Sequence, residues 1–126
     1  MFDENNSYEW YNKAIDFCQQ GKHEQEIWCY DKALEIKPDD YFSWFNKGTV
    51  LDEMGKPEFA IMCYDQVLRL KPDDFKALNN KGKSLCFLKK YKEALACFEK
   101  AMELEPNDAV IKWNKDSTIE KMTAFF

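Results

Sequence analysis

The sequence lacks any long apolar run and any concentration of basic residues. No stretch approaches the roughly 18 consecutive apolar residues of a transmembrane helix. Residues 1–7 have neither the basic start nor the apolar core of a signal peptide. Lysines and arginines number 18 against 23 aspartates and glutamates, which gives a net charge of −5. Without a basic stripe, we expect neither nucleic acid nor an anionic membrane surface as a partner.

Residues with catalytic chemistry are also scarce. The only histidine, His23, follows a glycine-containing turn and belongs to no known motif, so we expect it on the surface. The chain contains no phosphate-binding glycine loop, no HExxH pair and no nucleophile elbow. These absences indicate a protein that is not an enzyme and needs no cofactor.

The five cysteines exclude a closed disulfide framework, because their number is odd, and no two of them form a CxxC motif. We interpret them as small apolar residues in a reduced, cytoplasmic protein. A metal or redox role is the alternative, and it would require a bound metal or a thiol of lowered pKa.

A period of 34 residues runs through the whole chain. An asparagine-lysine pair recurs at positions 12–13, 46–47, 80–81 and 114–115. Cys29, Cys63 and Cys97 keep the same spacing. The period divides the chain into blocks 7–40, 41–74 and 75–108, followed by a partial block 109–126. Repeats of this length are typical of stacked helical arrays.

Each full block has the pattern of two helices. In the first half, apolar or small residues recur at i, i+4 and i+7, as at Trp44, Gly48 and Leu51. A break and a second helical stripe follow, and the block ends at a proline and two acidic or amide residues. Proline ends the second helix, and the residues after it can cap the next one. The sequence therefore predicts three helix–turn–helix units and a final single helix, in an all-α protein.

This pattern resembles the tetratricopeptide repeat (TPR) from residue 7 to residue 126. The characteristic residues in the second and third blocks are Trp44, Gly48, Leu51, Ala60, Tyr64, Val67 and Pro72, and Leu78, Gly82, Leu85, Ala94, Phe98, Ala101 and Pro106. The resemblance implies a right-handed α-solenoid forming a single domain, 1–126, with repeats 7–40, 41–74 and 75–108 and a solvating helix at 109–126.

Two features depart from the family pattern. Glu26 stands where a small residue is usual, so we expect it either to splay the first helix pair or to extend its carboxylate into water. A lysine follows the repeated asparagine in all four copies, where the family usually has leucine. We expect its stem to cover apolar surface while its ammonium group reaches water.

The resemblance also implies that the first helices of the repeats line a concave face that holds a peptide. The residues placed there by register are Tyr11, Asn12, Ile15, Phe42, Phe45, Asn46, Thr49, Lys76, Asn79, Asn80 and Lys83. Aromatic rings dominate in the first two repeats, and lysines and asparagines in the third. Tyr11 and Phe45 either contact a partner or pack between repeats, and Lys76 and Lys83 either hold a carboxylate or form a solvated face.

One subset of TPR proteins grips the C-terminal carboxylate of heat-shock chaperone tails with five polar residues. Asn46 and Lys76 match that clamp, whereas Tyr11, Ile15 and Asn80 occupy its other three positions. We therefore do not expect a chaperone tail as the ligand. A peptide with apolar anchors and one acidic group fits these residues better.

Two functions remain open from the sequence. The first is a non-catalytic scaffold or adaptor that binds an extended peptide, with the repeated asparagines either contacting its backbone or recurring only because the repeats were duplicated. The second is self-association into a homo-oligomer, either by dimerisation or by swapping of terminal helices, with Phe125 and Phe126 at the chain end docking on a neighbouring copy.

Overall fold

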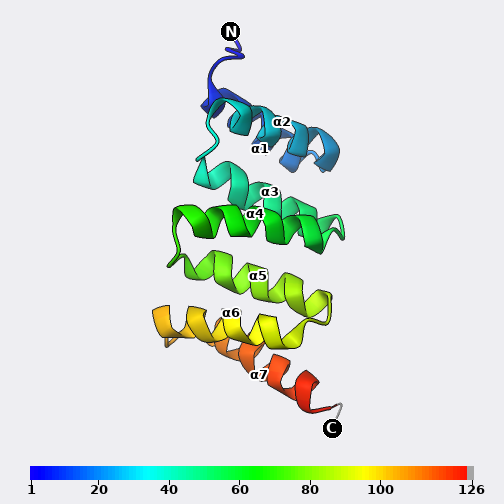
Figure 1. The fold of residues 1–126 in the computed structure, drawn as a ribbon. Coiled ribbons are helices and arrows are strands. Elements are labelled where there is room, and N and C mark those ends of the chain that lie inside the picture. The colour runs from blue at the N-terminus through cyan, green and yellow to red at the C-terminus, as the bar shows by residue number, and fades with distance from the viewer. Residues whose placement is uncertain (125–126) are drawn as a thin grey trace.

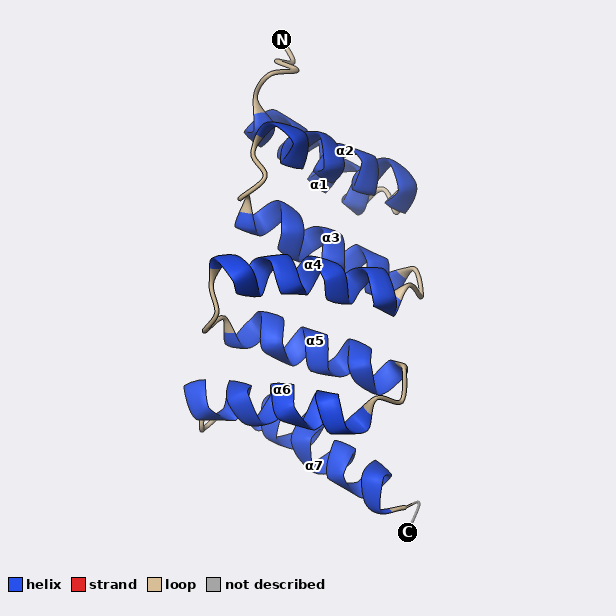
Figure 2. Cartoon of the chain, in the orientation of Figure 1, coloured by secondary structure: helices blue, strands red, loops and turns tan. Residues whose placement is uncertain are grey.

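The structure is a computed structural model that describes residues 1–124; Phe125 and Phe126, which the self-association hypothesis uses, lie outside the described residues. Within residues 1–124 all regular structure is helical (Figure 2). The helices are α1 (Ser7–Gln19), α2 (His23–Ile36), α3 (Tyr41–Glu53), α4 (Pro57–Leu70), α5 (Phe75–Phe87), α6 (Tyr91–Leu104) and α7 (Ala109–Thr123). The predicted all-α class is confirmed.

The helices are stacked in chain order, with the two termini at opposite ends of the stack (Figure 1). Each helix packs on its sequence neighbours, and α3 and α5 also contact across the intervening α4, as do α5 and α7 across α6. The molecule is therefore an α-solenoid, in which each unit buries its apolar stripe against the units beside it. The helices α1, α3, α5 and α7 each begin a repeat and are called the first helices.

The predicted helix boundaries have a clear local cause. Asp40, Asp74 and Asp108 precede α3, α5 and α7, and each carboxylate accepts hydrogen bonds from backbone N–H groups in the first turn. Such caps satisfy donors that the helix itself leaves free. Pro57 is the first residue of α4, a position where proline loses no helical hydrogen bond.

A small residue facing a ring holds together the two helices of each repeat. A Cβ atom added to Gly82 would lie 2.5 Å from Cε1 of Phe98, and one added to Gly48 would lie 2.7 Å from Cε1 of Tyr64. Both rings are almost wholly buried. The small residue of the repeat pattern is therefore a packing requirement, since it lets the second helix lay an aromatic ring against the first.

The lysine of the repeated pair ties one repeat to the next. Lys47 Nζ lies 2.5 Å from a carboxylate oxygen of Asp31 on α2, and Lys81 Nζ lies 2.6 Å from one of Asp65 on α4. Both lysine side chains stay partly exposed, at 21% and 26%, so each ammonium group lies at the surface and is paired there with a carboxylate that the sequence analysis did not name. Lys13 Nζ in α1 instead lies 4.9 Å from the ring centroid of Phe2.

None of the helices within residues 1–124 has both the length and the apolar character that crossing a membrane requires.

Candidate partner-binding face

Side-chain hydrogen bonds connect the first helices directly to one another. Asn46 Nδ2 donates to Tyr11 Oη at 3.0 Å, which links α3 to α1. Asn114 Nδ2 donates to Asn79 Oδ1 at 2.8 Å, which links α7 to α5. The surface that α1, α3, α5 and α7 form together is called the first-helix face. The predicted binding residues all lie on three of these helices, α1, α3 and α5.

The repeated asparagines consequently differ in what they can offer a partner. Asn46 and Asn114 each use an amide N–H to hold two helices together. Asn12 and Asn80 make no side-chain hydrogen bond with other residues in the range 1–124. Asn80 is half-buried on α5, where the preceding first helix presents Phe45 in place of a hydroxyl. Its amide donors and acceptor are therefore free for a ligand.

The predicted aromatic residues also fall into two groups, those that pack between helices and one that is exposed. The ring of Tyr11 packs 6.2 Å from that of Tyr30, and the ring of Phe45 stacks 5.9 Å from that of Tyr41. Tyr11 and Phe45 are both half-buried, so much of each ring serves packing between helices. Phe42, by contrast, is 62% exposed on the same face.

A hollow of about 250 Å³ gathers four of the predicted residues. It is lined by Phe45, Phe75, Lys76, Asn79, Asn80, Asp108, Val110 and Ile111. The side chains of Lys76, Asn80 and Phe45 therefore lie together around this hollow. Tyr11, Asn12, Ile15 and Phe42 are not among its lining residues; they lie on α1 and at the start of α3. Thr49 donates its hydroxyl to the Phe45 carbonyl within α3.

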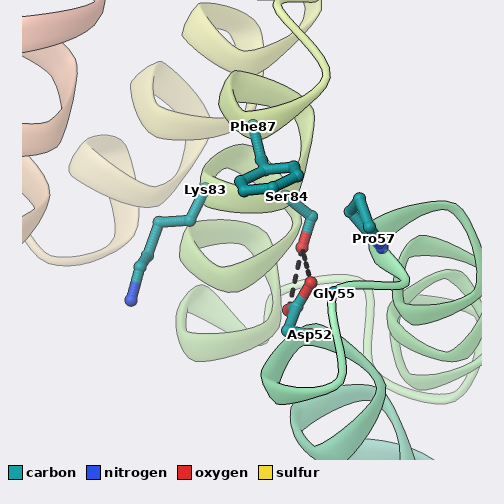
Figure 3. Close-up of a pocket in the computed structure, with 6 residues that line it drawn as sticks. All are labelled: Asp52, Gly55, Pro57, Lys83, Ser84 and Phe87. Atoms are coloured by element: carbon teal, nitrogen blue, oxygen red, sulfur yellow. Dashed lines mark hydrogen bonds between the residues drawn. The ribbon is translucent and has the colours of Figure 1, made fainter.

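Lys83, the remaining predicted residue, borders a second hollow of about 200 Å³ (Figure 3). Ser84 Oγ donates to both carboxylate oxygens of Asp52, at 2.8 and 2.9 Å, and Tyr64 Oη donates to the same group at 2.8 Å. Burial raises the pKa of the Asp52 carboxyl, and these two donors oppose the rise. The Lys83 side chain points away from Asp52. The carboxylate therefore acts as a hydrogen-bonded link between α3 and α5.

Glu26 is buried beside the partly exposed His23. Glu26 is only 2% exposed and accepts a hydrogen bond from Tyr30 Oη at 3.0 Å. His23 is half-buried, with Nδ1 3.2 Å from Glu26 Oε1 and Nε2 4.0 Å from a carboxylate oxygen of Glu53. The expectation that Glu26 extends its carboxylate into water was wrong, because two polar partners satisfy the carboxylate in a buried position. Burial raises the pKa of Tyr30, and the neighbouring Glu26 raises it further.

The thiols show no sign of activation. Burial raises the pKa of the Cys63 thiol to about 11, and it also raises the pKa values of Cys29 and Cys97. A reactive thiol needs a lowered pKa. Among residues 1–124 no three histidine, cysteine, aspartate or glutamate side chains are placed to hold a metal ion. What the described surface offers is binding, through exposed rings, amides and lysines.

The sequence profile of the tetratricopeptide repeat family matches residues 41–74 and 75–108, which is more than half of the chain.

The chain belongs to the tetratricopeptide repeat family.

TPR domains are non-catalytic scaffolds for protein interaction, and the chain is therefore a protein-interaction module. Among curated proteins no significant sequence match was found.

Solved TPR domains have the same fold. The first TPR domain of Spaghetti (RPAP3), bound to the HSP90 peptide SRMEEVD, is 22% identical with a TM-score of 0.88, and the match covers 96% of each chain. The first TPR domain of human RPAP3 is 21% identical with a TM-score of 0.85, over 97% of this chain and 96% of that one. The Sgt2 TPR domain from Aspergillus fumigatus is 22% identical with a TM-score of 0.82, over 93% and 79%.

The TPR register identifies a residue that the sequence analysis overlooked. Trp113 lies 34 residues after Asn79 and so shares the position of Tyr11 and Phe45. It is 69% exposed on α7. The predicted binding residues come only from the three full repeats, and the same register continued into the last helix leads directly to this ring.

Proposed function

We propose that the chain binds an extended segment of a partner protein along the first-helix face. The observation that carries the proposal is the exposure of large rings on that face, beside a hollow that contains a lysine and a free amide. Tyr8 is 66% exposed and Phe42 is 62% exposed, whereas a stack of helices gains stability only from rings that it buries. Exposed aromatic side chains gathered on one face are typical of interaction sites.

The chemistry of the face favours a segment with apolar anchors and an acidic group. The apolar anchors would contact Tyr8 and Phe42, on α1 and α3. The acidic group would pair with Lys76, and the Asn80 amide would bond the backbone of the segment. Lys83, about two helical turns further along α5, adds positive charge to the same half of the face.

A heat-shock chaperone tail does not fit this proposal, even though the Spaghetti TPR domain holds an HSP90 peptide. In this chain Tyr11 occupies one clamp position, and its hydroxyl already accepts a hydrogen bond from Asn46. Ile15 brings an apolar side chain to another. The partner would therefore differ from those tails, and the free thiol of the exposed Cys18 suits a reduced, cytoplasmic setting.

Selection from a random peptide library by the immobilised full chain tests the proposal. We expect selected peptides to combine aromatic or aliphatic residues with an acidic group. Phe42→Ser and Lys76→Glu should each weaken their binding at least about tenfold, because both side chains are exposed on the face that the segment would contact. Lys92→Glu, which changes an exposed lysine on α6, is the matched charge control. Selected peptides that bind all three variants like the parent chain would refute the proposal.

Self-association is the second candidate, because α7 ends the described stack with Trp113 and Ile119 exposed. Sedimentation over a hundredfold range of concentration tests it. A concentration-dependent dimer that is lost on deleting Phe125 and Phe126 supports this function, and a monomer throughout rules it out.

A further inference from the structure

A third, largely apolar hollow lies where α2, α3 and α4 meet. It has a volume of about 400 Å³ and is lined by Ile27, Trp44, Lys47, Leu51, Lys56, Phe59, Met62 and Cys63. Leu51 and Cys63 are buried, whereas Phe59 is 56% and Met62 63% exposed. The buried pair forms the floor and the exposed pair the walls of what is called the α2–α4 hollow. It shares no lining residue with the hollow around Lys76 and Asn80.

The other repeats show that the fold does not need these apolar walls. Phe59 occupies the register position of Gln25 in the first repeat and Glu93 in the third, and all three are exposed. Met62 occupies the position of Trp28 in the first repeat and of Ala96 in the third, so only the third repeat has a small residue there. Since a stack built from the same unit tolerates a polar or a small residue there, the two large apolar side chains stabilise little in the stack. Exposed apolar side chains that packing does not require are typical of binding surfaces.

Within residues 1–124, the charged residues that line the α2–α4 hollow leave one unpaired positive charge. Both charged residues that line it are lysines, Lys47 and Lys56. Lys47 is already paired with Asp31, but Lys56 is exposed and forms no ion pair with other residues in the described chain. Lys56 also precedes α4, and its side chain does not cap that helix. The positive end of α4 adds to the lysine charge, so a ligand with negative charge is favoured.

We propose that the α2–α4 hollow binds a short acidic segment of a partner protein that inserts one large apolar side chain. The volume lies at the lower end of the roughly 300–1,000 Å³ of ligand sites, enough for a single aromatic or aliphatic anchor. The rings of Trp44 and Phe59 and the Met62 side chain contact the anchor. Acidic residues on either side of it pair with Lys56 and with the end of α4. The module then carries two binding surfaces that can be occupied together.

Chemical-shift mapping on the full chain, labelled with ¹⁵N, tests this proposal with a defined probe. The probe is a peptide of about ten residues with a central phenylalanine flanked by glutamates. We expect shifts at the amides of Trp44, Phe59 and Met62. Phe59→Glu installs the residue that the third repeat has at this position. It should weaken binding of the probe peptide at least about tenfold while leaving the helicity of the chain unchanged.

Two matched controls make the result specific. Ala96→Glu, which adds the same negative charge at an exposed position of α6, should bind the probe as the parent chain does, and a peptide with lysines in place of the glutamates should bind at least about tenfold more weakly. The proposal is overturned if the probe does not bind, if Phe59→Glu binds it unchanged, or if the lysine peptide binds equally well. It is also overturned if the free chain dimerises and Phe59→Glu abolishes the dimer, because a second copy would then occupy the hollow.

Discussion

The junction between repeats one and two and the junction between repeats two and three share a spacing but differ in their chemistry. Both contain a lysine–aspartate pair, Lys47 with Asp31 in the first junction and Lys81 with Asp65 in the second. In both, a first helix contacts the second helix of the repeat before it. Contacts that recur at each junction are those that build the stack.

The polar contacts between first helices differ between these two junctions, although Asn114 and Asn79 repeat the Asn46–Tyr11 contact between α7 and α5. In the first junction Asn46 bonds to Tyr11, whereas in the second Asn80 meets Phe45 and makes no side-chain bond with residues 1–124. The second junction instead uses Ser84 and Asp52. Residues common to both junctions therefore specify the fold. At positions where the junctions differ, polar side-chain groups such as the Asn80 amide stay free for a partner.

Gly82→Ala should have the largest effect among the stability predictions. The new methyl group would meet the buried Phe98 ring, and overpacking of this kind costs about 1–3 kcal/mol. The free energy of unfolding in urea measures it. Ala14 faces Tyr30 in the first repeat, so that repeat already accommodates the methyl group that the third one should resist. An unfolding free energy equal to that of the parent chain would contradict the packing argument.

Tyr30→Phe should have the second largest effect on stability, because it removes a hydrogen-bond donor from the buried Glu26 carboxylate. We expect a loss of about 1–2 kcal/mol. The double change Glu26→Ala with Tyr30→Phe reproduces the third repeat, which has Ala94 and Phe98. That variant should recover most of the loss, since an apolar pair can replace a buried polar one. If the double variant is less stable than Tyr30→Phe alone, the account of this site is wrong.

Phe45→Tyr should give a smaller effect of opposite sign. It places in the second junction the hydroxyl that Tyr11 supplies in the first, within reach of the Asn80 amide. We expect a gain of about 0.5–1.5 kcal/mol, typical of one added hydrogen bond. A double-mutant cycle with Asn80→Ala should remove the gain. A gain that survives Asn80→Ala would show that it does not arise from this bond.

Lys47→Met should have the smallest effect. It removes the ion pair with Asp31 and keeps an apolar stem, and half-exposed pairs of this kind contribute about 1 kcal/mol or less. Repeating the urea titration at high salt should shrink the difference further, because salt screens the pair in the parent chain. A difference that grows with salt would rule out an ionic origin.

The fold could be predicted from the sequence because the residues that produce it recur at a fixed spacing. A small residue at 14, 48 and 82, a ring at 30, 64 and 98, and an aspartate cap at 40, 74 and 108 recur every 34 residues, and each has a local reason. The buried position of Glu26 could not be predicted by comparison with the other repeats, which lack it. Its hydrogen-bond donor, Tyr30, lies one helical turn away on α2. The pair could have been predicted from the sequence only by considering hydrogen bonds between side chains one turn apart.

The binding residues could be predicted only in part, and their role remains a prediction. The register placed Tyr11 and Phe42 on one face, but which of the two rings is exposed depends on how neighbouring helices pack. The side chains of the α2–α4 hollow differ visibly from their register partners, Phe59 from Glu93 among them. The hollow itself depends on the spacing of α2, α3 and α4, which no single segment encodes.

The most direct test of the central claim is a chemical-shift map of the full chain with a peptide selected from the random library. The account predicts that the largest shifts fall on the first-helix face, at Tyr8, Phe42, Lys76 and Asn80. Shifts confined to α2, α4 and α6 would contradict it.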